Sequence, residues 1–109
     1  MNRMGAYTLI EELLRMYETL DLHVSTLPAD GERQLGFVVG PFPGTAPSLL
    51  PERAFVPVSW TLQRIDTLLP FLVAAKSRAL PEDMALVAAR ARTARKRWAA
   101  ALASHAETA

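Results

Sequence analysis

The 109-residue chain contains no cysteine, and this absence removes several kinds of chemistry at once. Without a thiol there is no disulfide framework, no thiolate nucleophile and no cysteine-based metal site. The chain also has little net charge, with 12 basic against 11 acidic residues, and half of its residues are apolar. This composition argues against disorder of the whole chain and predicts a single small domain over residues 1–109.

Long apolar runs are absent as well. The longest, Leu68 to Ala75, is far shorter than a membrane-spanning helix and contains Pro70. The N-terminus reaches Glu11 and Glu12 before an apolar signal segment develops. We therefore expect a cytoplasmic protein with no membrane partner. Arginine greatly outnumbers lysine, and alanine and proline are frequent, which suggests a bacterial, phage or plasmid (mobile-element) origin.

Recognisable catalytic motifs are also missing. His23 and His105 stand far apart in the chain, and neither has a second imidazole at the spacing of a metal site. The glycines form no phosphate-binding loop, and no serine lies in a nucleophile-elbow motif. We therefore expect no catalytic residue, no metal site and no cofactor, and we predict that the protein is not an enzyme.

The first third of the chain predicts a helix followed by a β-hairpin. Apolar residues recur at steps of three and four over residues 8–20, where Thr8 and Glu11 have the spacing of a capping box. Apolar and polar residues then alternate over residues 22–39, on both sides of the turn sequence Pro28–Gly31. Proline and glycine in that turn favour a reversal of the chain.

The rest of the chain predicts a proline-rich loop and two long helices. Prolines exclude a central strand from residues 40–58, although Ala54 to Val58 is compatible with a short edge strand. Residues 59–79 read as a helix that Pro70 either kinks or interrupts, and residues 81–105 read as another helix. We expect an α+β fold in which these two helices pack as an antiparallel pair.

The proline-rich loop contains candidate partner-binding residues. Prolines flank Phe42 and the pair Leu49-Leu50, so these apolar side chains stand on stiff backbone that loses little entropy on binding. The alternative is that they fold back and close the core.

Charge is distributed unevenly along the chain, because the last predicted helix carries a run of basic residues. Residues 90–109 hold five cations and one acid, whereas residues 1–89 hold seven cations and ten acids. Guanidinium groups bind phosphates, and an exposed tryptophan stacks on bases. Alternatively, the cations pair with the acidic first helix or only face solvent. The candidate partner- or phosphate-binding residues are Arg90, Arg92, Arg95, Lys96, Arg97 and Trp98.

The same helix carries an apolar seam rich in alanine. Its members recur at alternating steps of three and four residues from Met84 to His105. Such a seam either forms a homodimer through residues 84–105 or packs inside the chain against residues 59–79. Because the apolar content of the two helices is similar, internal packing is slightly favoured.

These observations predict a small protein-binding protein. We expect an accessory, regulatory or inhibitor protein that occupies a surface of a larger protein or complex. The alternative is a nucleic-acid-associated protein that uses the basic helix. The two differ in salt dependence, which is steep for phosphate contacts and mild for a protein groove.

Overall fold

The computed structural model describes residues 1–27, 30–40, 53–73 and 79–108, and the α+β class predicted from the sequence is confirmed there. Within these ranges the chain forms three helices and three strands. In chain order they are α1 (Arg3–Tyr17), β1 (His23–Thr26), β2 (Arg33–Val39), β3 (Ala54–Pro57), α2 (Val58–Val73) and α3 (Glu82–Thr108).

Helix α1 begins earlier than its apolar pattern predicts. Asn2 is the N-cap, and its side-chain oxygen accepts a hydrogen bond from the Gly5 backbone N–H at 2.7 Å. The predicted start at Thr8 is wrong, because Thr8 lies inside the helix and its hydroxyl donates to the Met4 carbonyl. The helix also ends at Tyr17, with Glu18 as C-cap, instead of reaching residue 20.

The three strands form an antiparallel sheet in the order β1-β2-β3. The predicted hairpin is confirmed by β1 and β2, whose register pairs His23 with Gly36. The short edge strand that the sequence allows over Ala54 to Val58 is present as β3, which pairs with β2 and stops at Pro57. Gly36 lies opposite Pro57, and a Cβ atom at Gly36 would stand 2.9 Å from the Pro57 Cα. A larger residue at Gly36 would therefore push β2 and β3 apart.

Helix α2 follows β3 directly, so its first residue is Val58 and Ser59 lies inside it. The helix continues through Pro70, which means that Pro70 does not start a new helix. The Asp66 carbonyl loses its usual helical donor there, because proline has no N–H. Residues 74–78 of the predicted helix lie outside the described ranges. Helix α3 begins after Pro81 with two acids in its first turn and extends to Thr108, three residues beyond the prediction.

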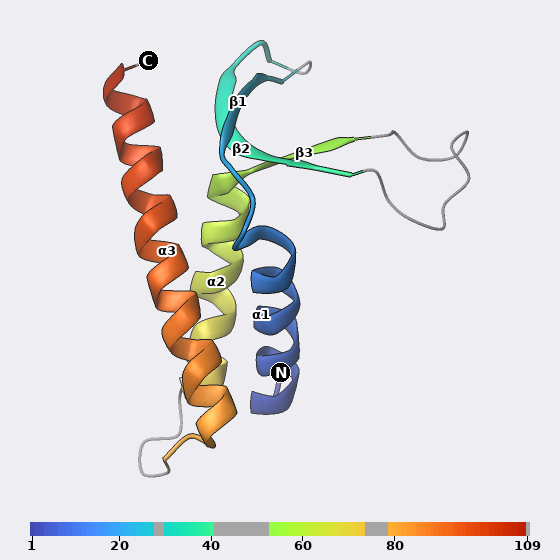
Figure 1. The fold of residues 1–109 in the computed structure, drawn as a ribbon, viewed down its shortest axis with the longest axis vertical. Helices are drawn as coiled ribbons and strands as arrows, with labels where there is room; N and C mark the ends of the chain where they lie inside the picture. Colours follow the sequence, from blue (N-terminus) through green and yellow to red (C-terminus); the bar gives the residue numbers. More distant parts are fainter. Residues whose placement is uncertain (28–29, 41–52, 74–78, 109) are drawn as a thin grey trace, which may run out of the picture.

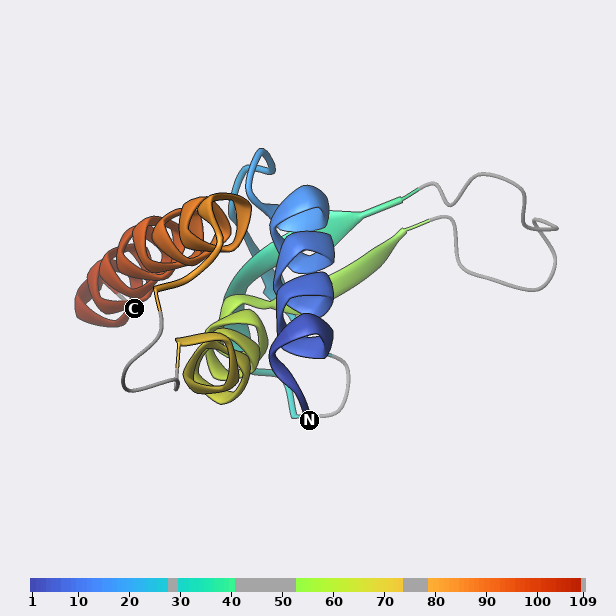
Figure 2. The same cartoon turned by 90° about the horizontal axis from the view of Figure 1, so that it is seen from below.

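The three helices lie side by side, and the sheet stands at one end of α1 and α2, beside the C-terminal half of α3 (Figure 1). Helices α1 and α3 run in one direction and α2 in the other, so the predicted antiparallel pair of α2 and α3 is confirmed. Seen along the helices, α2 contacts both α1 and α3 (Figure 2). Among the described residues, no helix combines the length and the apolar character needed to cross a bilayer.

An aromatic cluster in the core joins α1 and α3 to the sheet. Phe37 of β2 lies between Tyr17 of α1 and Trp98 of α3, with ring centroids 4.9 Å and 5.2 Å apart. Phe37 and Trp98 are fully buried. The helices contribute the other fully buried apolar side chains, which are Ala6, Ile10, Leu14, Val58, Ile65, Leu68, Leu72, Ala88 and Ala91.

Candidate functional site

Three cations of the basic run hold α3 against the other two helices. Arg90 donates to both carboxylate oxygens of Glu18, with the shorter contact at 2.8 Å. Arg97 donates to the Glu18 backbone carbonyl at 2.7 Å. Arg95 donates to both carboxylate oxygens of Asp66 on α2, from Nη2 at 3.1 Å and from Nε at 2.5 Å. These three side chains are therefore engaged within the chain.

The pKa values of the two acids reflect these contacts. Hydrogen bonds from Arg90 hold the pKa of Glu18 below its ordinary value, and those from Arg95 do the same for the pKa of Asp66. All four side chains remain partly exposed, so solvent screens both pairs and each contributes little to stability.

Arg92 and Lys96 differ from the other three cations. Both are exposed on the outer face of α3, and neither has an ion pair or side-chain hydrogen bond within the described part of the chain. The helical pattern accounts for this split, since Arg90, Arg95 and Arg97 flank the buried stripe whereas Arg92 and Lys96 lie opposite it. Any phosphate contact from this helix therefore depends mainly on two side chains.

The remaining member of the predicted basic site, Trp98, belongs to the core. It is fully buried, so it cannot stack on a base or reach a partner surface, and its assignment to that site is corrected. The reason is its position on the apolar seam, where Met84, Val87, Ala91 and Ala94 are also at most 7% exposed. These buried seam residues pack inside the chain, where α3 lies against α2, so the internal alternative accounts for this part of the seam. The loop residues Phe42, Leu49 and Leu50 lie outside the described ranges.

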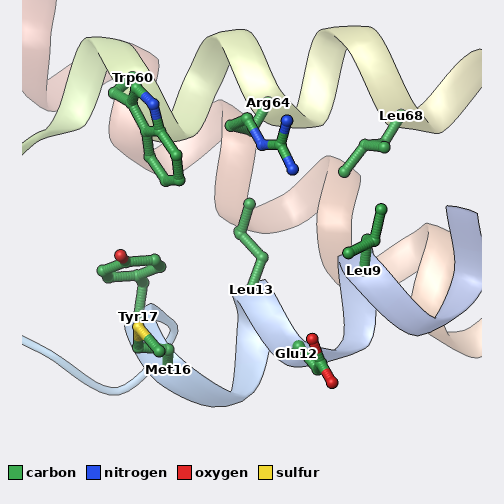
Figure 3. Close-up of a pocket in the computed structure, with 8 residues that line it drawn as sticks. All are labelled: Leu9, Glu12, Leu13, Met16, Tyr17, Trp60, Arg64 and Leu68. Carbon is green, nitrogen blue, oxygen red and sulfur yellow. The ribbon is translucent and has the colours of Figure 1, made fainter.

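A different surface remains open, namely a groove between α1 and α2 (Figure 3). It encloses about 170 Å³, and most of its lining is apolar. We call this surface the α1–α2 groove, and it is lined by Leu9, Glu12, Leu13, Met16, Tyr17, Trp60, Arg64 and Leu68.

Two large apolar side chains of the groove are half exposed. Trp60 of α2 is 46% exposed and Met16 of α1 is 49% exposed, and they lie on facing walls (Figure 3). The floor between them is nearly closed, because Leu13 and Leu68 are at most 7% exposed. Single exposed apolar residues are common on protein surfaces, but a tryptophan and a methionine on the two walls of one hollow form a patch suited to a partner.

Opposite charges stand on the two walls of the groove. Glu12 is exposed on α1, and Arg64 on α2 is half buried, with its guanidinium carbon 5.6 Å from the Trp60 ring centroid. Neither residue takes part in an ion pair within the described ranges. Both charges are thus available to a group that enters the groove.

The sequence analysis did not single out Met16 or Trp60 as candidate binding residues. A signal for Trp60 was present, however. The buried stripe of α2 consists of Thr61, Ile65, Leu68 and Leu72, and at about 100° per residue Trp60 lies beside this stripe instead of within it. The apolar type of Trp60 by itself favours burial, whereas its position on the helix indicates an exposed side chain.

In the part of the chain that the structure describes, no three potential metal ligands among histidine, aspartate and glutamate come together. The chain matches no protein-family profile, no curated protein and no solved structure.

Proposed function

We propose that this chain is a small non-enzymatic protein-binding protein and that the α1–α2 groove is its docking surface. One observation carries the proposal. The chain buries Trp98 completely but leaves Trp60 and Met16 about half exposed on facing walls of an apolar hollow. An accessory, regulatory or inhibitor protein that occupies a partner surface would use such a patch.

The chemistry of the groove supports protein recognition. Tryptophan is the residue most enriched where binding energy concentrates, and the flexible methionine thioether adapts to different apolar partners. Glu12 and Arg64 at the rim would orient the partner through charge, while the apolar floor would provide burial.

A site-specific photo-cross-linker tests this function. Placed at Met16 of the full chain in a bacterial lysate, it should yield a discrete protein adduct that Trp60→Ala removes. The matched control carries the cross-linker at Leu86, which is 60% exposed on α3 outside the groove. If positions 16 and 86 give the same adducts, or if Trp60→Ala has no effect, the groove is not the docking surface.

Nucleic-acid association through α3 is the second candidate, and the exposure of Arg92 and Lys96 favours it. A duplex bound through two phosphate contacts should show a log–log salt slope of about −1.8, which Arg92→Ala with Lys96→Ala should flatten. A lack of measurable duplex binding at low salt would exclude this candidate. The cytoplasmic location and the bacterial, phage or plasmid origin stay predictions from composition.

A further inference from the structure

Resting on the proposed function, we infer that the occupant of the α1–α2 groove is a second copy of this chain, related by a two-fold axis that runs along the groove. The first support is the order of side chains on the two walls. Trp60 lies across from Met16 and Tyr17, Arg64 lies across from Glu12 and Leu13, and Leu68 lies across from Leu9 (Figure 3). The groove thus has three levels, each with one contribution from α2.

A two-fold axis parallel to the helices places α1 of one copy on α2 of the other and keeps every level aligned. Trp60 then faces Met16 of the second copy, a favourable contact between sulfur and an aromatic ring. Arg64 faces Glu12 of the second copy. Because the axis repeats each contact, two such ion pairs and two such aromatic contacts form.

Charge selects this arrangement over the other two-fold arrangement. An axis across the helices would place α1 on α1 and α2 on α2, so that Glu12 approaches Glu12 and Arg64 approaches Arg64, which is repulsive. Within one chain these opposite charges stand on opposite walls without an ion pair between them in the described residues. The groove is therefore complementary to itself.

The size of the groove indicates a reversible dimer. Stable interfaces bury about 800 Å² on each partner, and the two helices that form this surface have only 15 and 16 residues. We expect monomer and dimer to exchange with concentration. Burial of Trp60 should shift its fluorescence to shorter wavelength on association, whereas Trp98 is buried in both states.

Sedimentation equilibrium of the full chain over a range of concentrations tests the inference. Trp60→Ala should weaken the dimer about thirtyfold or more, as expected for a central tryptophan. Leu86→Ala removes an exposed apolar side chain outside the groove and should leave the dissociation constant unchanged. Far-UV circular dichroism of each variant checks that it is folded.

Charge reversal provides a second test that removes no apolar surface. Glu12→Arg or Arg64→Glu alone should weaken the dimer about tenfold or more, and the double variant should recover most of the loss because the pair is restored with reversed sign. Arg92→Glu on α3 is the matched control and should have no effect. A dimer that is insensitive to these changes would overturn the inference.

A monomer at every concentration would also overturn the inference. In that case a Trp60-dependent cross-link from position 16 to a different protein would leave the proposed function intact. A Trp60-dependent cross-link that joins two copies of the chain supports the inference and the role of the groove as a docking surface. The absence of any Trp60-dependent protein adduct, in a monomeric chain, overturns both proposals.

Discussion

At the scale of single residues, Glu18 is where α1 meets α3. It is the C-cap of α1, where a carboxylate faces the negative end of the helix dipole, an unfavourable position on its own. Arg90 offsets this by donating to the carboxylate, and Arg97 donates to the Glu18 backbone carbonyl at the same helix end. Pairing of the basic run with the acidic first helix was one of the alternatives drawn from the sequence, and Arg90 and Glu18 form such a pair.

Substitution Glu18→Gln should lower the free energy of unfolding by about 0.5–1 kcal/mol near neutral pH, because it removes the charge and keeps the backbone acceptor for Arg97. The pKa of Glu18 is lower in the folded chain than its ordinary value of 4.5, so the folded state binds this proton less readily. The stabilisation is therefore present above pH 4.5 and is lost as pH falls through the folded-state pKa.

Urea titrations of wild type and Glu18→Gln across this pH range measure the effect. The difference between the two proteins should disappear toward acid, and Arg92→Ala, which removes an exposed cation without a partner in the described structure, should show no such difference. A difference that stays constant with pH would contradict the assignment of the effect to this ion pair.

Gly36 controls the spacing between two strands. A Cβ atom there would overlap the Val56 carbonyl and stand 2.8 Å from the Phe55 ring. Gly36→Ala should therefore lower the free energy of unfolding by about 2 kcal/mol or more. Gly31→Ala is the control, because it has open space and only the positive φ of 71° to strain it, at about 1 kcal/mol. Urea denaturation should rank Gly36→Ala well below Gly31→Ala in stability.

At the scale of elements, the start of a helix could be predicted where several sequence signals agreed. The start of α3 was predictable because Pro81, Glu82 and Asp83 together suit only a helix N-terminus. The start of α1 was not, because Thr8 and Glu11 have capping-box spacing although they lie inside a helix that Asn2 already caps. Spacing alone does not show whether the hydroxyl meets free N–H groups.

This difference yields a direct test. Asn2→Ala should lower the free energy of unfolding by about 1 kcal/mol, since it removes the side chain that accepts from the Gly5 N–H. Thr8→Ala should be neutral or slightly stabilising, because Thr8 is exposed within the helix and alanine has the higher helix propensity. Thermal unfolding followed by circular dichroism compares the two. A larger loss for Thr8→Ala would indicate that α1 begins at Thr8.

At the scale of the whole molecule, the elements could be predicted but their meeting points could not. The periodicity of the sequence is consistent with Trp98 on an apolar stripe and Phe37 on one face of a strand, yet nothing in either pattern brings the two residues together. The candidate groove was missed for the same reason, because it needs α1 and α2 side by side and antiparallel before Met16 and Trp60 face each other. Such pairings depend on the tertiary fold, which local spacing does not encode.

The aromatic cluster predicts how strongly the sheet depends on the helices. Phe37 is the only fully buried apolar side chain that the described strands contribute, and it contacts Tyr17 of α1 and Trp98 of α3. Phe37→Ala should therefore lower the free energy of unfolding by about 3–5 kcal/mol, through lost burial and a cavity. That loss is a large part of the total stability of a typical domain, so sheet and helices should unfold together.

Near-UV circular dichroism and urea denaturation measure this dependence. The near-UV signal of Trp98 should weaken in Phe37→Ala, because the ring that packs edge-on against it is gone. Val24→Ala is the matched control on β1, where the side chain is 43% exposed and its loss should cost well under 1 kcal/mol. Equal costs for the two variants would mean that the sheet contributes little to the common core. A large cost for Phe37→Ala alone would show that one side chain couples the sheet to α1, which forms one wall of the proposed docking groove, and to α3.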